Sequence, residues 1–274
     1  MSQGISRIVL HRLLSTNLDG IIHYSHRFER VEHLDSGRLK VHFANGEVAE
    51  GDVLVAADGV HSTIRKQLLP ESCQPVKPEP HIYGIAGKIF VDSEEQFKEI
   101  AFSNLRRGSC LIAAGDGRGI YIASLRYSAE TKIHIAKIFQ DVDGVLHEDA
   151  YSSHDDLDMV GGAGKKPLID NARDYIFWGY HTRHESDIPT DGNIGSMKDI
   201  SPQDLLDAVI KQLEKGNWSD ELVQLMKKSD VNTVSYWPFT IAPHITDISI
   251  YKASNITFIG DSIHTSTYLS CLLG

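Results

Sequence analysis

Two aspartates that directly follow strand-like apolar segments are the side chains best placed to do chemistry. Asp58 comes after the apolar run at residues 53–57, and Asp261 comes after the run at residues 255–259. Ligands of open α/β sheets lie outside the carboxyl ends of the strands, where a carboxylate can accept hydrogen bonds from ligand hydroxyls. Either aspartate taken alone is also consistent with a turn that only ends its strand.

The residues around these aspartates form three spaced motifs. In chain order they are Arg7-x-x-Leu10-x-x-x-Leu14 on a predicted N-terminal helix, Asp58-Gly59-x-x-Ser62-x-x-Arg65, and Gly260-Asp261-x-x-His264. Ser62 is expected to cap a short helix that runs to Leu69, because a serine oxygen can accept from the first free N–H groups of a helix.

In this order, the three motifs resemble those of the single-component, class A FAD-dependent flavoprotein monooxygenases. The resemblance implies that Asp261 accepts hydrogen bonds from the ribityl hydroxyls of FAD and that Arg7 reaches the cofactor near its diphosphate. It further implies NADPH as reductant, O2-dependent hydroxylation of a small and often aromatic organic substrate, and no protein nucleophile, so no catalytic residue is named. The candidate cofactor-binding residues are Arg7, Asp58, Gly59, Arg65, Gly260 and Asp261.

The sequence departs from that family at both ends. Intact members begin with a strand, a GxGxxG turn and a helix that receives the FAD diphosphate, and this chain contains no GxGxxG. The glycine-rich stretches at residues 115–119 and 161–164 lack the phosphate-binding spacing and are predicted as loops, the first as a hairpin. The family's proline after His264 is absent. We therefore expect a truncated form that alone binds FAD weakly or not at all. A non-redox descendant or substrate-binding module that has lost FAD and one half of a split enzyme are the alternatives.

The predicted elements indicate an α/β fold, with a partial Rossmann-type FAD-binding domain interrupted by a mostly antiparallel β-sheet substrate domain. We place the partial FAD-binding domain at residues 1–76, the substrate domain at 77–239 and the return to the FAD-binding domain at 240–274, with a proline-spaced linker near 76–80. The run at residues 53–57 is predicted as a strand buried on both faces of a parallel sheet. Further strands are expected at 83–91, 110–114, 120–126 and 175–182, and helices at 93–100, 131–140, 201–214 and 220–228.

Composition limits the partners. The chain has 27 Lys and Arg against 37 Asp and Glu, a formal net charge of −10, which argues against nucleic acid or an anionic membrane as partner. Cys73, Cys110 and Cys271 lack disulfide or zinc spacing, and the segment at residues 181–185 lacks the HExxH order, so no metal site is expected. The three unpaired cysteines and the lack of a membrane-length apolar run lead us to expect a cytoplasmic protein, and the missing GxSxG turn argues against a common type of hydrolase. The small organic substrate is what the resemblance implies. An unpaired strand edge also predicts self-association, or a partner chain that supplies the missing βαβ unit.

Overall fold

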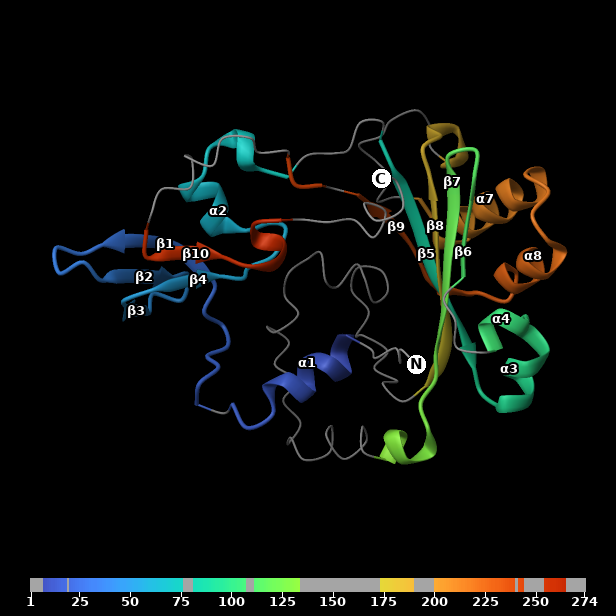
Figure 1. Cartoon of the computed structure of the whole chain (residues 1–274), viewed down its shortest axis with the longest axis horizontal. Helices are drawn as coiled ribbons and strands as arrows, with labels where there is room; N and C mark the ends of the chain where they lie inside the picture. Colours follow the sequence, from blue (N-terminus) through green and yellow to red (C-terminus); the bar gives the residue numbers. More distant parts are fainter. Residues whose placement is uncertain are drawn as a thin grey trace. The chain divides into compact units, whose positions relative to one another are not determined.

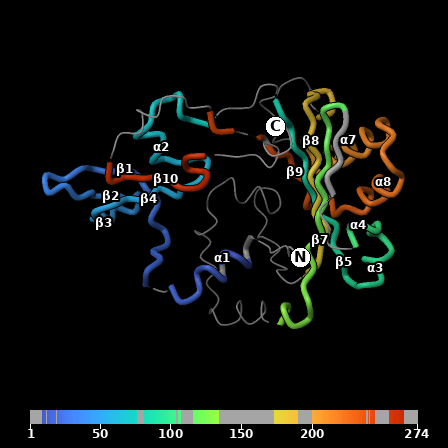
Figure 2. The backbone as a smooth tube through the Cα atoms, in the orientation of Figure 1, coloured from blue at the N-terminus to red at the C-terminus, as the bar shows by residue number. Residues whose placement is uncertain are grey.

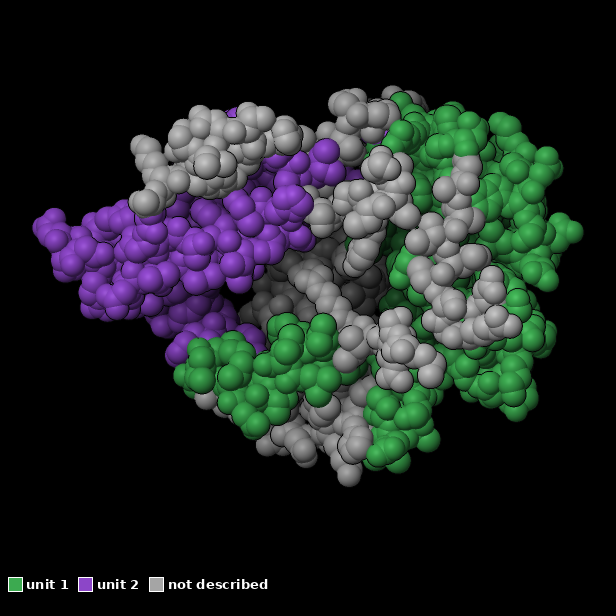
Figure 3. Space-filling view, in the orientation of Figure 1, with its two compact units in different colours: residues 1–22, 82–238 green, residues 23–81, 239–274 purple. Residues whose placement is uncertain are grey.

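The structure is a computed structural model of the 274-residue chain, and it describes residues 7–18, 20–75, 81–106, 111–133, 173–189, 200–239, 241–243 and 254–264. The chain forms two compact units, coloured separately in Figure 3. They are Met1–Ile22 with Ile82–Pro238 (unit 1), and His23–His81 with Phe239–Gly274 (unit 2). This division differs from the expected domains in grouping residues 1–22 with the middle of the chain. The linker expected near 76–80 lies outside the described residues.

Unit 1 is built on a five-stranded antiparallel sheet (Figure 1). The strands follow the order β6-β7-β8-β5-β9, and their bounds are Tyr83–Val91 (β5), Leu111–Gly115 (β6), Arg118–Leu125 (β7), Asp174–Thr182 (β8) and Asp230–Pro238 (β9). The four strands predicted in this part of the chain are confirmed, and so is the hairpin at residues 115–119. The sequence analysis did not predict β9.

Four helices of unit 1 lie on one side of this sheet (Figure 1). They are α3 (Glu94–Ile100), α4 (Ser103–Arg106), α7 (Pro202–Lys215) and α8 (Asp220–Met226). Ser201 caps α7 as its Oγ accepts from the N–H of Asp204 (3.1 Å), and apolar side chains of α7 and α8 form one core with strand residues such as Trp178. The predicted N-terminal helix is present as α1 (Arg7–Ser15), whereas the helix predicted at 131–140 extends beyond the described residues.

Unit 2 holds two small sheets, one antiparallel and one parallel. Glycines in the left-handed region turn the antiparallel sheet, with φ of +81° at Gly37 and +87° at Gly46. The parallel pair joins β4 and β10, which lie side by side although they are far apart in sequence (Figure 2). The elements are β1 (Phe28–His33), β2 (Leu39–Phe43), β3 (Val48–Gly51), β4 (Leu54–Ala56), α2 (Thr63–Leu68), η1 (Glu71–Cys73), β10 (Ile256–Phe258) and η6 (Gly260–Ser262).

One expectation about β4 is wrong. The all-apolar run at residues 53–57 predicts burial on both faces, but Val53 and Val55 are 64% and 50% exposed, while Ala56 is buried. Ile259, beyond the end of β10, is also exposed. Among the described residues β4 pairs only with β10, so its other edge is unpaired. The exposure of Val53 and Val55 shows that one apolar face of the pair lacks a complete covering layer.

The buried side chain of Arg65 links the turn after β4 to the turn after β10. Its guanidinium donates to the backbone carbonyls of Ser262 (2.7 Å), Asp261 (3.2 Å) and Val60, and to the side-chain oxygen of Gln74 (3.2 Å). Only 1% of Arg65 is exposed, so these acceptors replace the water that a charged side chain would otherwise need.

A second buried charge, Asp187 in the 3-10 turn η3 (Glu185–Asp187), ties β7 to β8 in unit 1. Its carboxylate accepts from the Nε and Nη2 atoms of Arg118 (2.6 and 2.8 Å), from Thr182 (2.6 Å) and from Tyr180 (3.1 Å). Burial alone would raise the pKa of Asp187, but the hydrogen bonds from Arg118, Thr182 and Tyr180 outweigh burial and hold the pKa below its ordinary value of 3.8.

Asp187→Asn is expected to lower the free energy of unfolding of unit 1 by about 3 kcal/mol at neutral pH, because Arg118 loses its buried partner. A depressed folded-state pKa stabilises above the unfolded-state value, so the difference from wild type should shrink below pH about 4 and vanish as the pH falls through the folded-state pKa. Urea unfolding followed by tryptophan fluorescence measures this, because Trp178, Trp218 and Trp237 all belong to unit 1. Asp116→Asn is the control, since exposed Asp116 also pairs with Arg118; equal losses in both variants would contradict the prediction.

Arg65→Met is expected to loosen unit 2, because the carbonyls of Val60, Asp261 and Ser262 lose their donor. Cys73 is 2% exposed in the same unit and reports opening through its reaction with a thiol reagent, in a background with serine at the other two cysteines. A loss of roughly 3 kcal/mol corresponds to labelling about 100-fold faster. Lys66→Met, at an exposed position of the same helix, should leave the rate unchanged. Equal rates for the two variants would show that Arg65 does not hold the unit together.

Candidate functional site

The turn after β4 is shaped by Asp58. Its Oδ2 atom accepts from the backbone N–H groups of Thr63 (2.9 Å) and Ile64 (3.3 Å), at the start of α2. Ser62, as predicted, caps the same helix, because its Oγ accepts from the N–H of Arg65 (2.9 Å). The carboxylate of Asp58 therefore satisfies helix N–H groups that would otherwise lack an acceptor, and it holds α2 against the end of the strand.

The turn after β10 is fixed by hydrogen bonds of the Ser262 hydroxyl. The buried hydroxyl of Ser262 lies 2.7 Å from both the carbonyl of Ala56 and the carbonyl of Ile259, so it bridges the ends of the two parallel strands. Asp261 precedes it with an exposed side chain. Ser262 was not among the residues predicted from the sequence. Its place directly after the Gly260-Asp261 pair is the signal that could have identified it.

Both turns present open backbone at a glycine. Gly59 has φ +78° and Gly260 has φ +61°, a region that side chains disfavour. A Cβ atom placed on either glycine would meet nothing within 4 Å, so a ligand can approach the backbone there. A hydroxyl-rich group such as the ribityl chain of FAD fits this edge, because an exposed carboxylate at Asp261 can accept from two hydroxyls.

The other two candidate residues are Arg65 and Arg7. The guanidinium of Arg65 already contacts backbone carbonyls and Gln74; burial lowers its pKa and the Asp58 carboxylate opposes this, and the group stays protonated in any physiological range. Its direct contact with a cofactor stays a prediction. Arg7 is the first residue of α1 and belongs to unit 1, but its side chain lies outside the described residues. The structure thus brings Asp58, Gly59, Arg65, Gly260 and Asp261 to one edge of unit 2.

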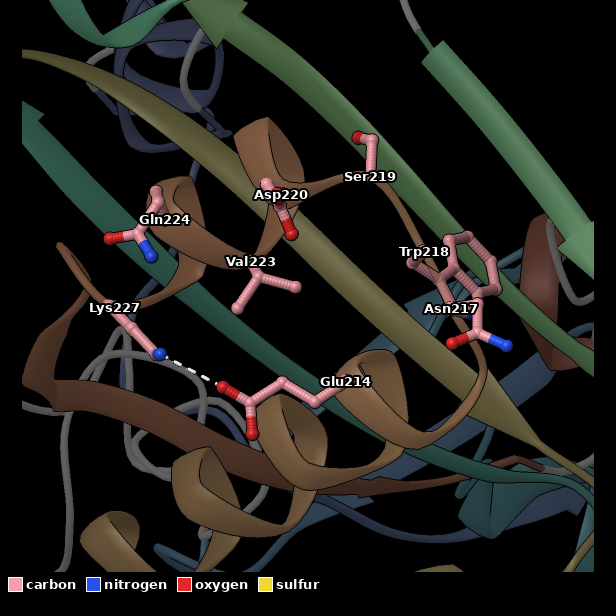
Figure 4. Close-up of a pocket in the computed structure, with 8 residues that line it drawn as sticks. All are labelled: Glu214, Asn217, Trp218, Ser219, Asp220, Val223, Gln224 and Lys227. Atoms are coloured by element: carbon pink, nitrogen blue, oxygen red, sulfur yellow. Dashed lines mark hydrogen bonds and ion pairs between the residues drawn. The ribbon is translucent and has the colours of Figure 1, made fainter.

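A separate polar pocket lies between the end of α7 and α8 (Figure 4). In its lining, the Nζ atom of Lys227 lies 2.9 Å from the Oε1 atom of Glu214, and Trp218 lies at one side. The lysine of this pocket is therefore already paired with a carboxylate, and the remaining charged residue of the lining is the exposed Asp220. The described residues also contain no group of three metal-ligating side chains, and within them no helix has the length and apolar character needed to cross a membrane.

Comparisons with known proteins point to one family. The chain matches no protein-family model. It is 36% identical over 98 residues to the FAD-dependent monooxygenase thnD of Trichoderma harzianum, covering 36% of this chain and 24% of that protein. It is 38% identical over 101 residues to the FAD-dependent monooxygenase nscC of Neosartorya fischeri, covering 22% of that protein.

Solved structures share the fold over nearly the whole chain. A crystal structure of an FAD-containing monooxygenase from Photorhabdus luminescens superposes with a TM-score of 0.65 at 24% identity, covering 94% of this chain and 56% of that one. HpxO of Klebsiella pneumoniae, in complex with FAD and uric acid, superposes with a TM-score of 0.53 at 18% identity, covering 96% of this chain and 49% of that one.

The chain therefore spans about half the length of these solved structures, and its alignments with the two curated relatives cover about a quarter of their length. The expected α/β architecture, with a partial Rossmann-type part and an antiparallel sheet, agrees with this likeness. Over the aligned segments the sequence is similar to proteins named FAD-dependent monooxygenase, and the fold is similar to that of an FAD-containing monooxygenase.

Proposed function

We propose that this chain is part of an FAD-dependent monooxygenase that uses NADPH and O2 to hydroxylate a small, aromatic organic substrate. One observation carries the proposal: the Asp58-Gly59 and Gly260-Asp261 turns end neighbouring parallel strands, and both offer open backbone to a ligand. The curated relatives named FAD-dependent monooxygenase support it. A cytoplasmic location is part of the proposal and is supported by the absence of disulfide spacing among the three cysteines.

Each of these residues has its own role in binding the cofactor. Asp261 accepts hydrogen bonds from ribityl hydroxyls, and Gly59 and Gly260 let the ligand approach the backbone. A phosphate contact of Arg7 is supported by the family resemblance alone. Asp58 and Arg65 act mainly by fixing the two turns, through the N–H groups of α2 and the carbonyls of Asp261 and Ser262. When bound, FAD would supply the redox and oxygen chemistry, while the protein supplies orientation and a site shielded from water.

Two alternatives have support of their own. A non-redox descendant is favoured by the structural roles of Asp58, which accepts from the N–H groups of α2, and of Arg65, which holds the turn after β10, because neither role needs a cofactor. A split enzyme, in which a partner chain completes the FAD-binding part, is supported by the exposed apolar side chains Val53, Val55 and Ile259 beside the parallel pair. Flavin content of the purified protein, with and without co-purifying chains, separates these from the main proposal.

Asp261→Ala is expected to weaken FAD binding by about ten- to a hundred-fold, because a hydroxyl bonded to a carboxylate contributes about 1.5–3 kcal/mol. Titration followed by flavin fluorescence measures the dissociation constant. Asp58→Ala is the comparison, and it should lower the melting temperature through the lost helix cap while changing affinity less. Equal affinities in wild type and both variants would remove Asp261 from the site.

Sedimentation is expected to show self-association of the purified chain, because Val53 and Val55 leave an apolar strand face exposed. Val55→Lys should shift the protein toward monomer by placing a charge on that face. Val48→Lys changes an equally exposed valine on β3 and should leave the association unchanged. A monomeric wild type that also fails to bind an apolar dye would contradict this prediction.

A further inference from the structure

Residues 20–27 form the last part of the connection between α1 and β1, and they contain no helix or strand (Figure 1). Ser25, in the middle of this entry segment, adopts φ +61°, which residues with a side chain disfavour. Such a conformation persists only where contacts on either side hold it in place. The contacts of the entry segment with the rest of unit 2 therefore decide whether it keeps this shape.

The imidazole ring of His26, the residue after Ser25, makes two of these contacts. Its Nε2 atom lies 2.8 Å from the Oε2 atom of Glu47, and its Nδ1 atom lies 2.5 Å from the backbone carbonyl oxygen of Tyr24. Glu47 lies in the turn that joins β2 to β3, and these two strands with their turn are the β2–β3 hairpin. The ring therefore links the entry segment to this hairpin.

Aromatic packing fixes the position of the same ring. Phe43 of β2 meets His26 edge-on with ring centroids 5.1 Å apart, and His23 meets it edge-on at 5.6 Å. Of the His26 side chain 20% is exposed, against 67% of the Glu47 side chain. The ring is thus enclosed on the hairpin, and the carboxylate of Glu47 reaches it from the solvent side.

Both hydrogen bonds of His26 exist together in one protonation state only. A backbone carbonyl and an ionised carboxylate are acceptors, so each ring nitrogen must carry a proton to bond to them. A neutral imidazole has a single N–H, and its other nitrogen would direct a lone pair at an oxygen. The observed arrangement is therefore that of the imidazolium, and loss of one proton breaks one of the two bonds.

The groups that face His26 act in the same direction. His23 in the entry segment and Glu47 in the hairpin are the titratable side chains beside it. The hydrogen bonds to the Tyr24 carbonyl and to Glu47 raise the pKa of His26 above its ordinary value of 6.5, against the opposing effect of burial. Because this pKa is raised in the folded state, the two bonds stabilise fully below about pH 6.5, and their contribution is lost as the pH rises through the folded-state pKa.

A permanent surface ion pair would need no histidine. An arginine or lysine at this position would pair with Glu47 throughout the physiological range, and an exposed pair of that kind contributes little. A histidine between two acceptors makes the contact depend on pH near neutrality. This property is particular to His26, because burial and the charges of Arg30 and Lys40 lower the pKa of His42 on the same hairpin.

We propose that His26 is a pH-sensitive latch: its imidazolium holds the entry segment on the β2–β3 hairpin, and loss of the ring proton releases the segment. Release lets Ser25 leave its left-handed conformation. The latch controls how firmly the connection to α1 is anchored on unit 2. It goes beyond the proposed function, because it needs neither cofactor nor substrate.

Hydrogen exchange of the full chain, read by mass spectrometry on peptides that cover residues 20–27, tests the latch at about pH 6 and about pH 8.5, on either side of the histidine range. Each rate is divided by that of an unstructured chain at the same pH. Wild type should lose protection roughly three- to five-fold at the higher pH, as an exposed ion pair implies. His26→Gln and Glu47→Gln should show low protection at both pH values. His33→Gln, at an exposed histidine of β1, is the matched control and should behave as wild type.

The proposal is overturned by protection that is independent of pH in wild type, by a pH dependence that survives in His26→Gln, or by its loss in His33→Gln. The amides of β2 (Leu39–Phe43) separate release from unfolding, because they should stay protected at both pH values. Their loss together with the entry segment would show unfolding and would also overturn the latch.

A measurement on the wild type alone keeps the proposal testable where a variant fails to fold. Spectra of the chain with 15N-labelled histidine report the protonation of each ring nitrogen. Both nitrogens of His26 should carry a proton at about pH 6, and one should lose it as the pH rises through the histidine range. A neutral His26 ring at about pH 6 would contradict the latch.

Discussion

One buried guanidinium holds the two aspartate-bearing turns of unit 2 together. The parallel strands β4 and β10 span only three residues each, a ladder too short to fix the loops beyond their ends. Arg65 supplies the missing constraint, because it bonds to backbone carbonyls at positions 261 and 262, which are 196 and 197 residues away in sequence, and to Val60 in its own turn. A guanidinium offers five donors spread over a rigid planar fork, whereas a lysine offers three donors on a single nitrogen.

The position of Arg65 depends in turn on how α2 begins. Asp58 accepts from the N–H groups of Thr63 and Ile64, and Ser62 accepts from the N–H of Arg65, so two side chains satisfy three of the helix's free donors. The helix then directs Arg65 toward the turn after β10. The two acidic residues therefore differ in their place in this arrangement: Asp58 accepts from the N–H groups of α2, whereas the exposed Asp261 lies in a turn whose carbonyls bond to Arg65.

Sequence patterns predicted the local elements well because each has a local cause. Glycines at the hairpins, serine caps at α2 and α7 and alternating runs at β5, β7 and β8 all act over a few residues. The patterns failed where the answer depends on partners. An all-apolar β4 predicts two covered faces, but whether Val55 is covered depends on which strands and helices surround it. The contacts of Arg65 with Ser262, and of Asp187 with Arg118, were equally invisible, because no periodicity links residues so far apart.

Lys88 is a half-buried ammonium in a chain with a net charge of −10. Although 37 acidic residues outnumber 27 basic ones, salt screens exposed charges beyond roughly 8–10 Å, so an approaching anion responds mainly to the nearest groups. A half-buried ammonium is screened far less than an exposed one, and the rings around it lower the local dielectric. The apolar strand Tyr83–Val91 contains a single charged residue, and the sheet directs that residue away from the helices. The same alternation that builds the core of unit 1 therefore places the Lys88 ammonium on the other face of the sheet, in a protein that is negative overall.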